Sequence, residues 1–120
     1  MPEEVSLLGV EEKITAYLIS LKIYPCLGGF DFLKEAIKIV YIKPLKVKNV
    51  NKVLYREVAL IFDNDGDFID GKMRHAIQSA NKRNGFSKFS ERFNCKTKNL
   101  FPSPKELIVA IVSKLVKDAC

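Results

Sequence analysis

Apolar residues recur at helical spacing along most of the chain, and this pattern limits the fold more than any other feature of the sequence. The clearest early run has apolar members at i, i+4, i+7, i+8 and i+11, namely Val10, Ile14, Tyr17, Leu18 and Leu21. A period near 3.6 residues predicts an amphipathic helix, here over residues 10–22, which Pro25 and the Gly28-Gly29 pair should end. The sequence thus favours helices over strands.

Further apolar stripes predict helices in the next part of the chain. A second helix is expected over residues 30–41. Segment 43–48 is interpreted as a basic connector, and Asn49 is expected to cap a short helix that runs through Leu54. Another helix is expected over 55–62, with an apolar stripe made of Val58, Ala59 and Phe62.

A long helix is predicted over 67–84. Asp67 is expected to cap its start, and Asp70 to lie at its third position, where a carboxylate meets free N–H groups. Gly85 is expected just past its end, before a short aromatic segment at 86–93. The buried stripe of this helix should comprise Ile69, Met73, Ala76, Ile77 and Ala80.

The strongest helix-start signal lies near the C-terminus. Ser103 and Glu106 have the spacing of a capping box, and Pro104 stands at the first helical position. A last helix is therefore predicted over 103–118. Its apolar run at 107–112 either is deeply buried or forms a dimer surface.

These segments predict an all-α fold, a compact bundle of about six helices in a single domain over residues 1–120. The N-terminus does not resemble a signal peptide, and the longest apolar run is too short to span a bilayer, so no membrane association is expected. The three cysteines are odd in number and widely spaced, which argues against a disulfide framework and fits a reducing cytoplasm.

Charge is distributed unevenly along the chain, whose net charge is +6. Residues 63–71 carry a charge of −4, and residues 72–98 carry +7. A solvated basic surface is one interpretation. The other is a phosphate-binding face, because clustered lysines and arginines gain affinity for nucleic acid by releasing counterions.

The aspartates that precede the long helix match a calcium loop only in part. Asp63, Asp65 and Asp67 occupy its positions 1, 3 and 5, but the loop needs glycine at position 6 and glutamate at position 12. Phe68 and Arg74 stand there, so no calcium, other metal or cofactor is expected. No nucleophile–base pair, paired carboxylates or glycine-rich phosphate loop indicates an enzyme.

Helices at 55–62 and 67–84, joined by a turn at 63–66, have the layout of a helix–turn–helix over about 55–84. Burying the apolar stripe of the longer helix leaves its opposite face free for a duplex. We predict that this face and the basic residues after it bind double-stranded DNA through Phe68, Gly71, Lys72, Arg74, His75, Gln78, Lys82, Arg83, Lys88 and Arg92.

Two roles are expected within this set. The four basic residues from Lys82 onward should hold phosphates, whereas Arg74, His75 and Gln78 should touch bases. His75 is the only histidine, and no second ligand stands at metal-binding spacing, so a surface or DNA-facing role is favoured for it.

Four segments resemble, in order and spacing, the C-terminal DNA-binding effector domain of the sporulation-initiation response regulator of endospore-forming bacteria. They are ITAYLISLKIYPCLGGFDFLKEAIKIVY, NKVLYREVALIF, MRHAIQSANKRNG and PSPKELIVAIVSKL. The resemblance covers roughly residues 10–118. It implies a bundle of about six helices with a helix–turn–helix, binding of short DNA boxes by adjacent copies, and a role in transcription control.

The chain departs from this family in two ways. The family's regulator has a phosphoacceptor receiver domain before the effector domain, and here Met1 stands only a few residues before it. We therefore expect a stand-alone domain, controlled by its expression level or a partner. In the reading helix, Phe68 and Gly71 replace arginines of the family and Asp70 replaces a glutamate, whereas Arg74 and His75 match it.

Two hypotheses follow. The first is a sequence-specific DNA-binding regulator whose target differs from the family's box. The second is a paralogue that has lost DNA reading and acts by self-association or by pairing with a related regulator, with the apolar run at 107–112 or the aspartate-rich 63–70 segment facing the partner.

Overall fold

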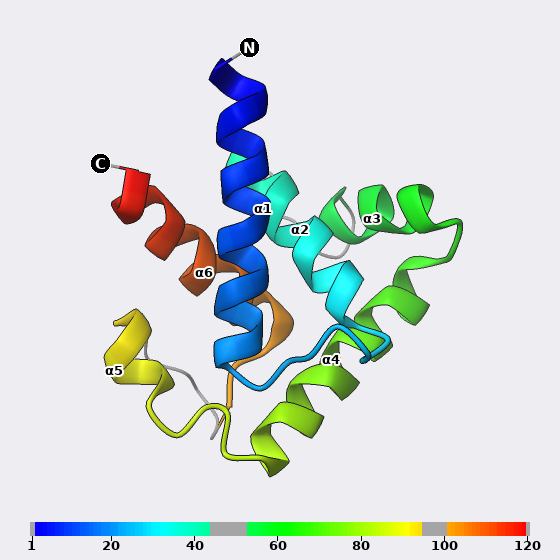
Figure 1. Cartoon of the computed structure of the whole chain (residues 1–120). Helices are drawn as coiled ribbons and strands as arrows, with labels where there is room; N and C mark the ends of the chain where they lie inside the picture. Colours follow the sequence, from blue (N-terminus) through cyan, green and yellow to red (C-terminus); the bar gives the residue numbers. More distant parts are fainter. Residues whose placement is uncertain (1, 44–52, 95–100, 120) are drawn as a thin grey trace.

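The computed structural model describes residues 2–43, 53–94 and 101–119, with side chains described between residues 9 and 118 of those ranges. This part of the chain contains six α-helices and no strand, which confirms the predicted all-α fold (Figure 1). The helices are α1 (Pro2–Ser20), α2 (Phe30–Ile42), α3 (Tyr55–Phe62), α4 (Gly66–Lys82), α5 (Phe89–Phe93) and α6 (Pro104–Ala119).

Helix α2 lies at the centre of the bundle and contacts α1, α3, α4 and α6 (Figure 1). Its apolar side chains are on more than one face, so it can be buried by several neighbours at once. The buried members are Phe30, Phe32, Leu33, Ala36, Ile37, Ile39 and Val40. Through α2, the pair α3–α4 is held against the rest of the fold.

Helix α6 begins as predicted. The backbone N–H of Ser103 donates to Glu106 Oε1 at 2.9 Å, and the N–H of Glu106 donates to Ser103 Oγ at 3.2 Å, which completes the capping box. Most of the apolar run is core, with Leu107, Ile108, Ala110 and Ile111 buried. The deeply buried interpretation therefore holds for these four residues, whereas Val109 of the same run is 39% exposed.

The first helix is longer than predicted. It begins at Pro2 rather than residue 10 and ends at Ser20 rather than residue 22, because Lys22 takes a left-handed backbone with a φ of 67°. The periodic apolar residues still behave as expected, since Val10, Ile14, Leu18 and Leu21 are buried.

The connection from α2 to α3 is only partly described. Lys43 closes α2, and its N–H donates to the carbonyl of Ile39 at 2.7 Å. The remainder of the predicted basic connector, Asn49 and most of the predicted short helix lie outside the described residues. Val53 and Leu54 form a π-type turn that leads into α3. Within the described residues, we find no helix with the length and apolar character needed to cross a bilayer.

Candidate nucleic-acid interface

Helices α3 and α4 pack against each other across a turn of three residues. Helix α3 ends where Asp63 takes a left-handed backbone with a φ of 55°, and the N–H of Asn64 donates to the carbonyl of Ala59 at 2.9 Å. The chain then extends at Asp65 and enters α4 at Gly66. Helix α3 has the predicted bounds, and this helix order is that expected for a helix–turn–helix.

The cap of α4 differs from the prediction. Asp65, with an extended backbone, accepts a hydrogen bond from the N–H of Phe68 at 2.8 Å, so Asp65 and not Asp67 is the N-cap. Because the N-cap lies two residues earlier than expected, Asp70 is the fifth residue of the helix rather than the third. Asp70 therefore lies beyond the free N–H groups and finds a different partner.

The two faces of α4 are arranged as predicted. Its buried residues are the five of the expected stripe, Ile69, Met73, Ala76, Ile77 and Ala80. All ten residues predicted to contact DNA are exposed, including Phe68, which is 42% exposed. The structure thus leaves these residues accessible to a large partner.

Apart from Lys82, the exposed residues of α4 fall into two groups that line separate shallow hollows. Phe68, Gly71, Lys72 and His75 line one of them together with Asp67. Arg74 and Gln78 line the other, with the segment 101–104 that leads into α6 on its far side. That segment was not part of the predicted interface.

Arg74 is held by a carboxylate of its own helix. Its Nε donates to Asp70 Oδ2 at 2.8 Å, and this hydrogen bond raises the pKa of Arg74. Asp70 Oδ1 is buried and has no hydrogen bond of normal geometry within the described residues. The pKa of the Tyr55 hydroxyl is raised, first by burial and then by the negative charge of Asp70.

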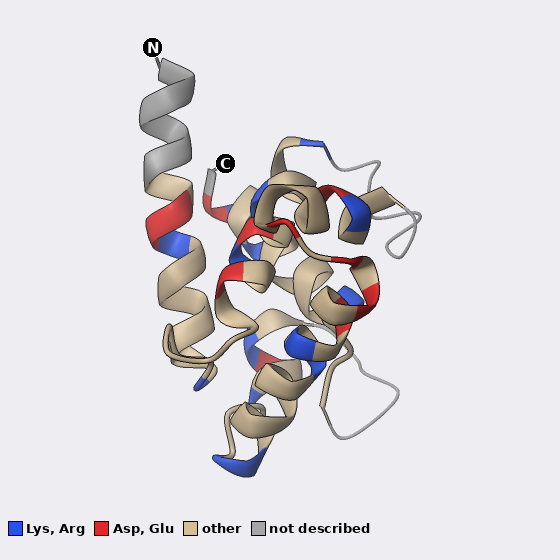
Figure 2. Ribbon diagram, turned by 90° about the vertical axis from the view of Figure 1, so that its right-hand side faces the viewer, with Lys and Arg blue, Asp and Glu red and all other residues tan. Residues whose placement is uncertain are grey.

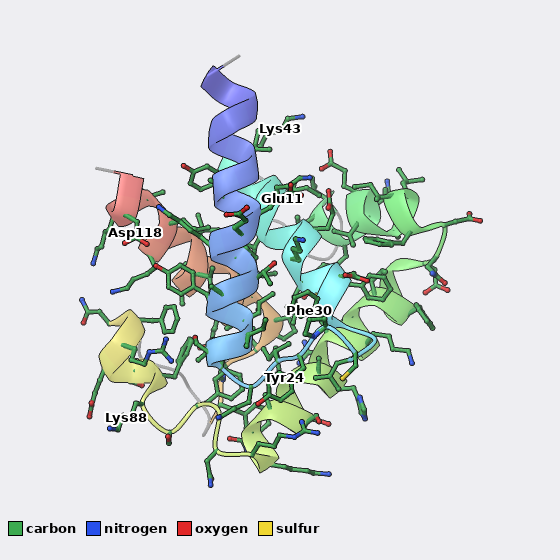
Figure 3. The ribbon with its side chains drawn as sticks, viewed as in Figure 1. Glu11, Tyr24, Phe30, Lys43, Lys88 and Asp118 are labelled. Carbon is green, nitrogen blue, oxygen red and sulfur yellow. The ribbon has the colours of Figure 1, made fainter. Side chains whose placement is uncertain are left out.

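The C-terminal end of α4 carries two of the four basic residues predicted to hold phosphates, Lys82 and Arg83. The guanidinium of Arg83 donates to Ser79 Oγ at 2.8 Å and lies 5.8 Å from the ring centre of Tyr24, which belongs to the loop between α1 and α2 (Figure 3). The side chain of Lys82 has no hydrogen bond or ion pair to another described residue.

The two basic residues near α5 are placed differently from each other. Lys88 precedes α5 at the outer edge of the molecule (Figure 3). Arg92 is turned toward the end of α1, where its guanidinium donates to Ser20 Oγ at 2.9 Å and lies over the ring of Phe93. The structure therefore brings Lys82 and Arg83 together at the end of α4, whereas the guanidinium of Arg92 is held at the end of α1.

Two glycines allow other parts of the fold to approach the backbone of α4. A Cβ added to Gly29 would lie 2.3 Å from the carbonyl oxygen of Lys72, and one added to Gly85 would lie 2.1 Å from that of Leu21. The end of α4 is a Schellman motif in which Asn84 takes the left-handed backbone and Gly85 donates to the carbonyl of Ala80 at 2.9 Å. Gly85 is therefore selected for close packing rather than for its backbone angles.

Charge is polarised along α4. The exposed carboxylates of Asp63, Asp65 and Asp67 surround its start, whereas Lys82 and Arg83 lie at its end (Figure 2). At 1.5 Å per residue the two ends are roughly 25 Å apart. The acidic start repels phosphate groups, and the basic end attracts them.

Two exposed features of α3 were missed in the sequence. Arg56 and Leu60 line a shallow hollow beside the turn, and Leu60 is 75% exposed. The exposure of Arg56 could have been predicted, because it directly follows Tyr55, which is buried, and consecutive residues of a helix point in different directions. In a helix–turn–helix, the first helix crosses the DNA backbone, so Arg56 can be added to the candidate phosphate contacts.

The described residues contain no group of three or more His, Cys, Asp or Glu side chains arranged to hold a metal ion. A protein-family model described as Sporulation initiation factor Spo0A C terminal matches residues 14–115 of the 120-residue chain. The match includes all six helices, apart from the start of α1 and the end of α6. The chain therefore belongs to the Spo0A C-terminal family of non-enzymatic, DNA-binding sporulation regulator domains.

Proposed function

We propose that this protein is a sequence-specific transcription regulator that acts in the cytoplasm, with α3 and α4 as its helix–turn–helix and α4 in the major groove. The observation that carries the proposal is the division of α4 into a completely buried stripe and an exposed face that ends in basic residues. A helix of this kind fits the major groove, whose width of about 12 Å admits one α-helix.

The proposed roles follow from position along α4. Lys82, Arg83 and Lys88 contact phosphates, which fixes the register of the protein on the duplex. His75 and Gln78 contact base edges, and Arg74 joins them when it is released from Asp70.

The proposed target differs from the box of the parent family. Phe68 and Gly71 stand where the family has arginines, and an arginine–guanine pair is worth about 1–3 kcal/mol of discrimination against other bases. Without those two arginine–guanine pairs, the base preference of this protein must come from other contacts.

The first experiment measures binding and its salt dependence. Purified protein is titrated into fluorescein-labelled 30-bp duplexes, one carrying a sequence selected from a random library by this protein and one scrambled. Arg56 of α3 joins Lys82, Arg83 and Lys88 as a fourth phosphate contact. Four contacts predict a fall in affinity of roughly 100-fold between 50 and 200 mM salt. Equal, weak binding of both duplexes contradicts the proposal.

Matched lysine variants then locate the contacts. Lys82→Ala should reduce the slope of log affinity against log salt by about one, because one phosphate contact is lost. Lys13→Ala, an exposed lysine of α1, should leave the slope unchanged. Equal effects of the two substitutions indicate nonspecific attraction rather than docking through α4.

A second candidate function is pairing with a related regulator without DNA reading. It is favoured by exposed apolar side chains on α3, since Leu60 and Ile61 are 75% and 54% exposed. Analytical ultracentrifugation with a full-length regulator of the family tests it. Complex formation that Leu60→Asp abolishes, together with absence of DNA binding, supports this function over the first.

A further inference from the structure

Phe68 is the one large apolar side chain of α4 that remains exposed. It is the third residue of the helix, close to the end that enters the groove in helix–turn–helix complexes. An aromatic ring at this position offers no hydrogen bond to a base edge or a phosphate. Its contribution must come from apolar contact.

The ring of Phe68 contacts side chains of α2 and α4. It packs edge-to-face against Phe32 of α2, with ring centres 6.1 Å apart, and Phe32 packs in the same way against Phe62 at 4.9 Å. The ammonium of Lys72 lies 5.5 Å from the ring centre of Phe68. A side chain that is already packed against the protein before binding loses less entropy when it contacts a ligand.

The space beside the ring is open. A Cβ added to Gly71 would meet nothing within 4 Å, and Gly71 lines the same shallow hollow as Phe68. Asp67 and His75 also border this hollow, so an apolar surface lies between polar groups. A small apolar group that projects from the floor of the major groove can reach the ring without displacing protein atoms.

The C5-methyl group of a pyrimidine is the apolar group that the major groove presents. We infer that Phe68 reads such a methyl group, which belongs to thymine or to 5-methylcytosine, and so gives this protein a base preference. The inference rests on the proposed function, because it requires α4 to lie in the major groove. It places a methyl contact in the first turn of α4.

Removing the methyl group alone tests this contact. The protein and its Phe68→Ala variant each select duplexes from a random library, and each thymine preferred only by the unaltered protein is replaced by uracil in a labelled 30-bp duplex. Burial of one methyl group predicts about fourfold weaker binding of the uracil duplex by the unaltered protein. The variant should bind the thymine and uracil duplexes equally.

A third duplex distinguishes the two sources of the methyl group. It carries 5-methylcytosine in place of the thymine, and its affinity is compared with that of a duplex that carries cytosine at the same position. A methyl effect here as well indicates that Phe68 reads the methyl group itself. An effect confined to thymine assigns the contact to thymine.

The controls separate this contact from general effects. Phe68→Leu keeps an apolar side chain and should retain part of the discrimination. Leu60→Ala removes an exposed apolar side chain of α3 and should retain all of it. Because each value is a ratio measured on one protein, partial unfolding of a variant cancels.

Equal binding of thymine and uracil duplexes at every selected position overturns the inference while leaving the proposed function in place. Failure to select any duplex overturns both.

Discussion

Replacing Gly29 by alanine should destabilise the fold by pushing α4 away from α2. The added Cβ would lie 2.3 Å from the carbonyl oxygen of Lys72 and 3.0 Å from Cβ of Ala76. The nearest neighbour is backbone within a helix, so it cannot move aside as the end of a long side chain can. Overpacking of this kind costs about 1–3 kcal/mol.

The backbone of Gly29 adds no further strain, because its φ of −87° and ψ of −6° suit any residue. Alanine also restricts the unfolded chain, which offsets about 0.4–1 kcal/mol of the cost. The middle values of these two ranges leave a net loss of about 1.3 kcal/mol. With a urea m-value of about 2 kcal/mol per molar, the unfolding midpoint should fall by roughly 0.5–1 M.

Gly71→Ala is the matched control, since it lies within α4 and its Cβ would meet nothing within 4 Å. Alanine is favoured over glycine inside a helix by about 0.5–1 kcal/mol, so this variant should be stabilised. Urea unfolding followed by circular dichroism at 222 nm measures both variants. If Gly29→Ala is as stable as Gly71→Ala, the close packing of α2 on α4 is wrong.

Three further predictions concern stability and charge. Burial, assisted by the hydrogen bond to Asp118, raises the pKa of Tyr17 from 10.0 to about 12, so its contribution to stability is complete below pH 10 and is lost as the pH rises toward 12. Urea unfolding at pH 9 and 11.5 should show this decline, and a Tyr17→Phe variant with an equally steep decline would refute it. Ser103→Ala removes one half of the α6 capping box and should lower the free energy of unfolding by about 1 kcal/mol in the same assay. An unchanged unfolding midpoint would contradict this prediction. Asp70→Asn removes a negative charge and frees Arg74, so DNA affinity should rise and the salt slope steepen by about one, whereas weaker binding would show that Asp70 is needed to orient Arg74.

The helices were predictable from the sequence where each is buried on one face only. The five buried residues of α4 and the bounds of α3 followed from apolar spacing. When a helix is buried on one face only, a single rotation about its axis places all its apolar side chains in the core. The start of α4 was less predictable. Several closely spaced aspartates are all competent caps, and only Asp65 has the extended backbone that directs its carboxylate to a free N–H.

Contacts between distant parts of the chain left no signal in local pattern. The approach of Gly29 to Lys72 depends on how α2 crosses α4, which apolar spacing does not specify. The same is true of Arg92, which was grouped with the phosphate contacts from its place in sequence but is directed toward Ser20. The Asp70–Arg74 pair was not predicted, although residues four apart on a helix are neighbours and the spacing could have indicated it.

The central claim is that the exposed face of α4 is the surface that meets DNA. At 13.6 kDa the protein suits ¹⁵N-resolved NMR, in which each backbone amide reports its own surroundings. Titration with the selected 30-bp duplex should shift the amides of Gly71, His75, Gln78 and Lys82 most strongly and leave those of the buried part of α6 unchanged. Shifts that cluster around Leu60 or on α1, with the α4 face unaffected, would contradict the claim.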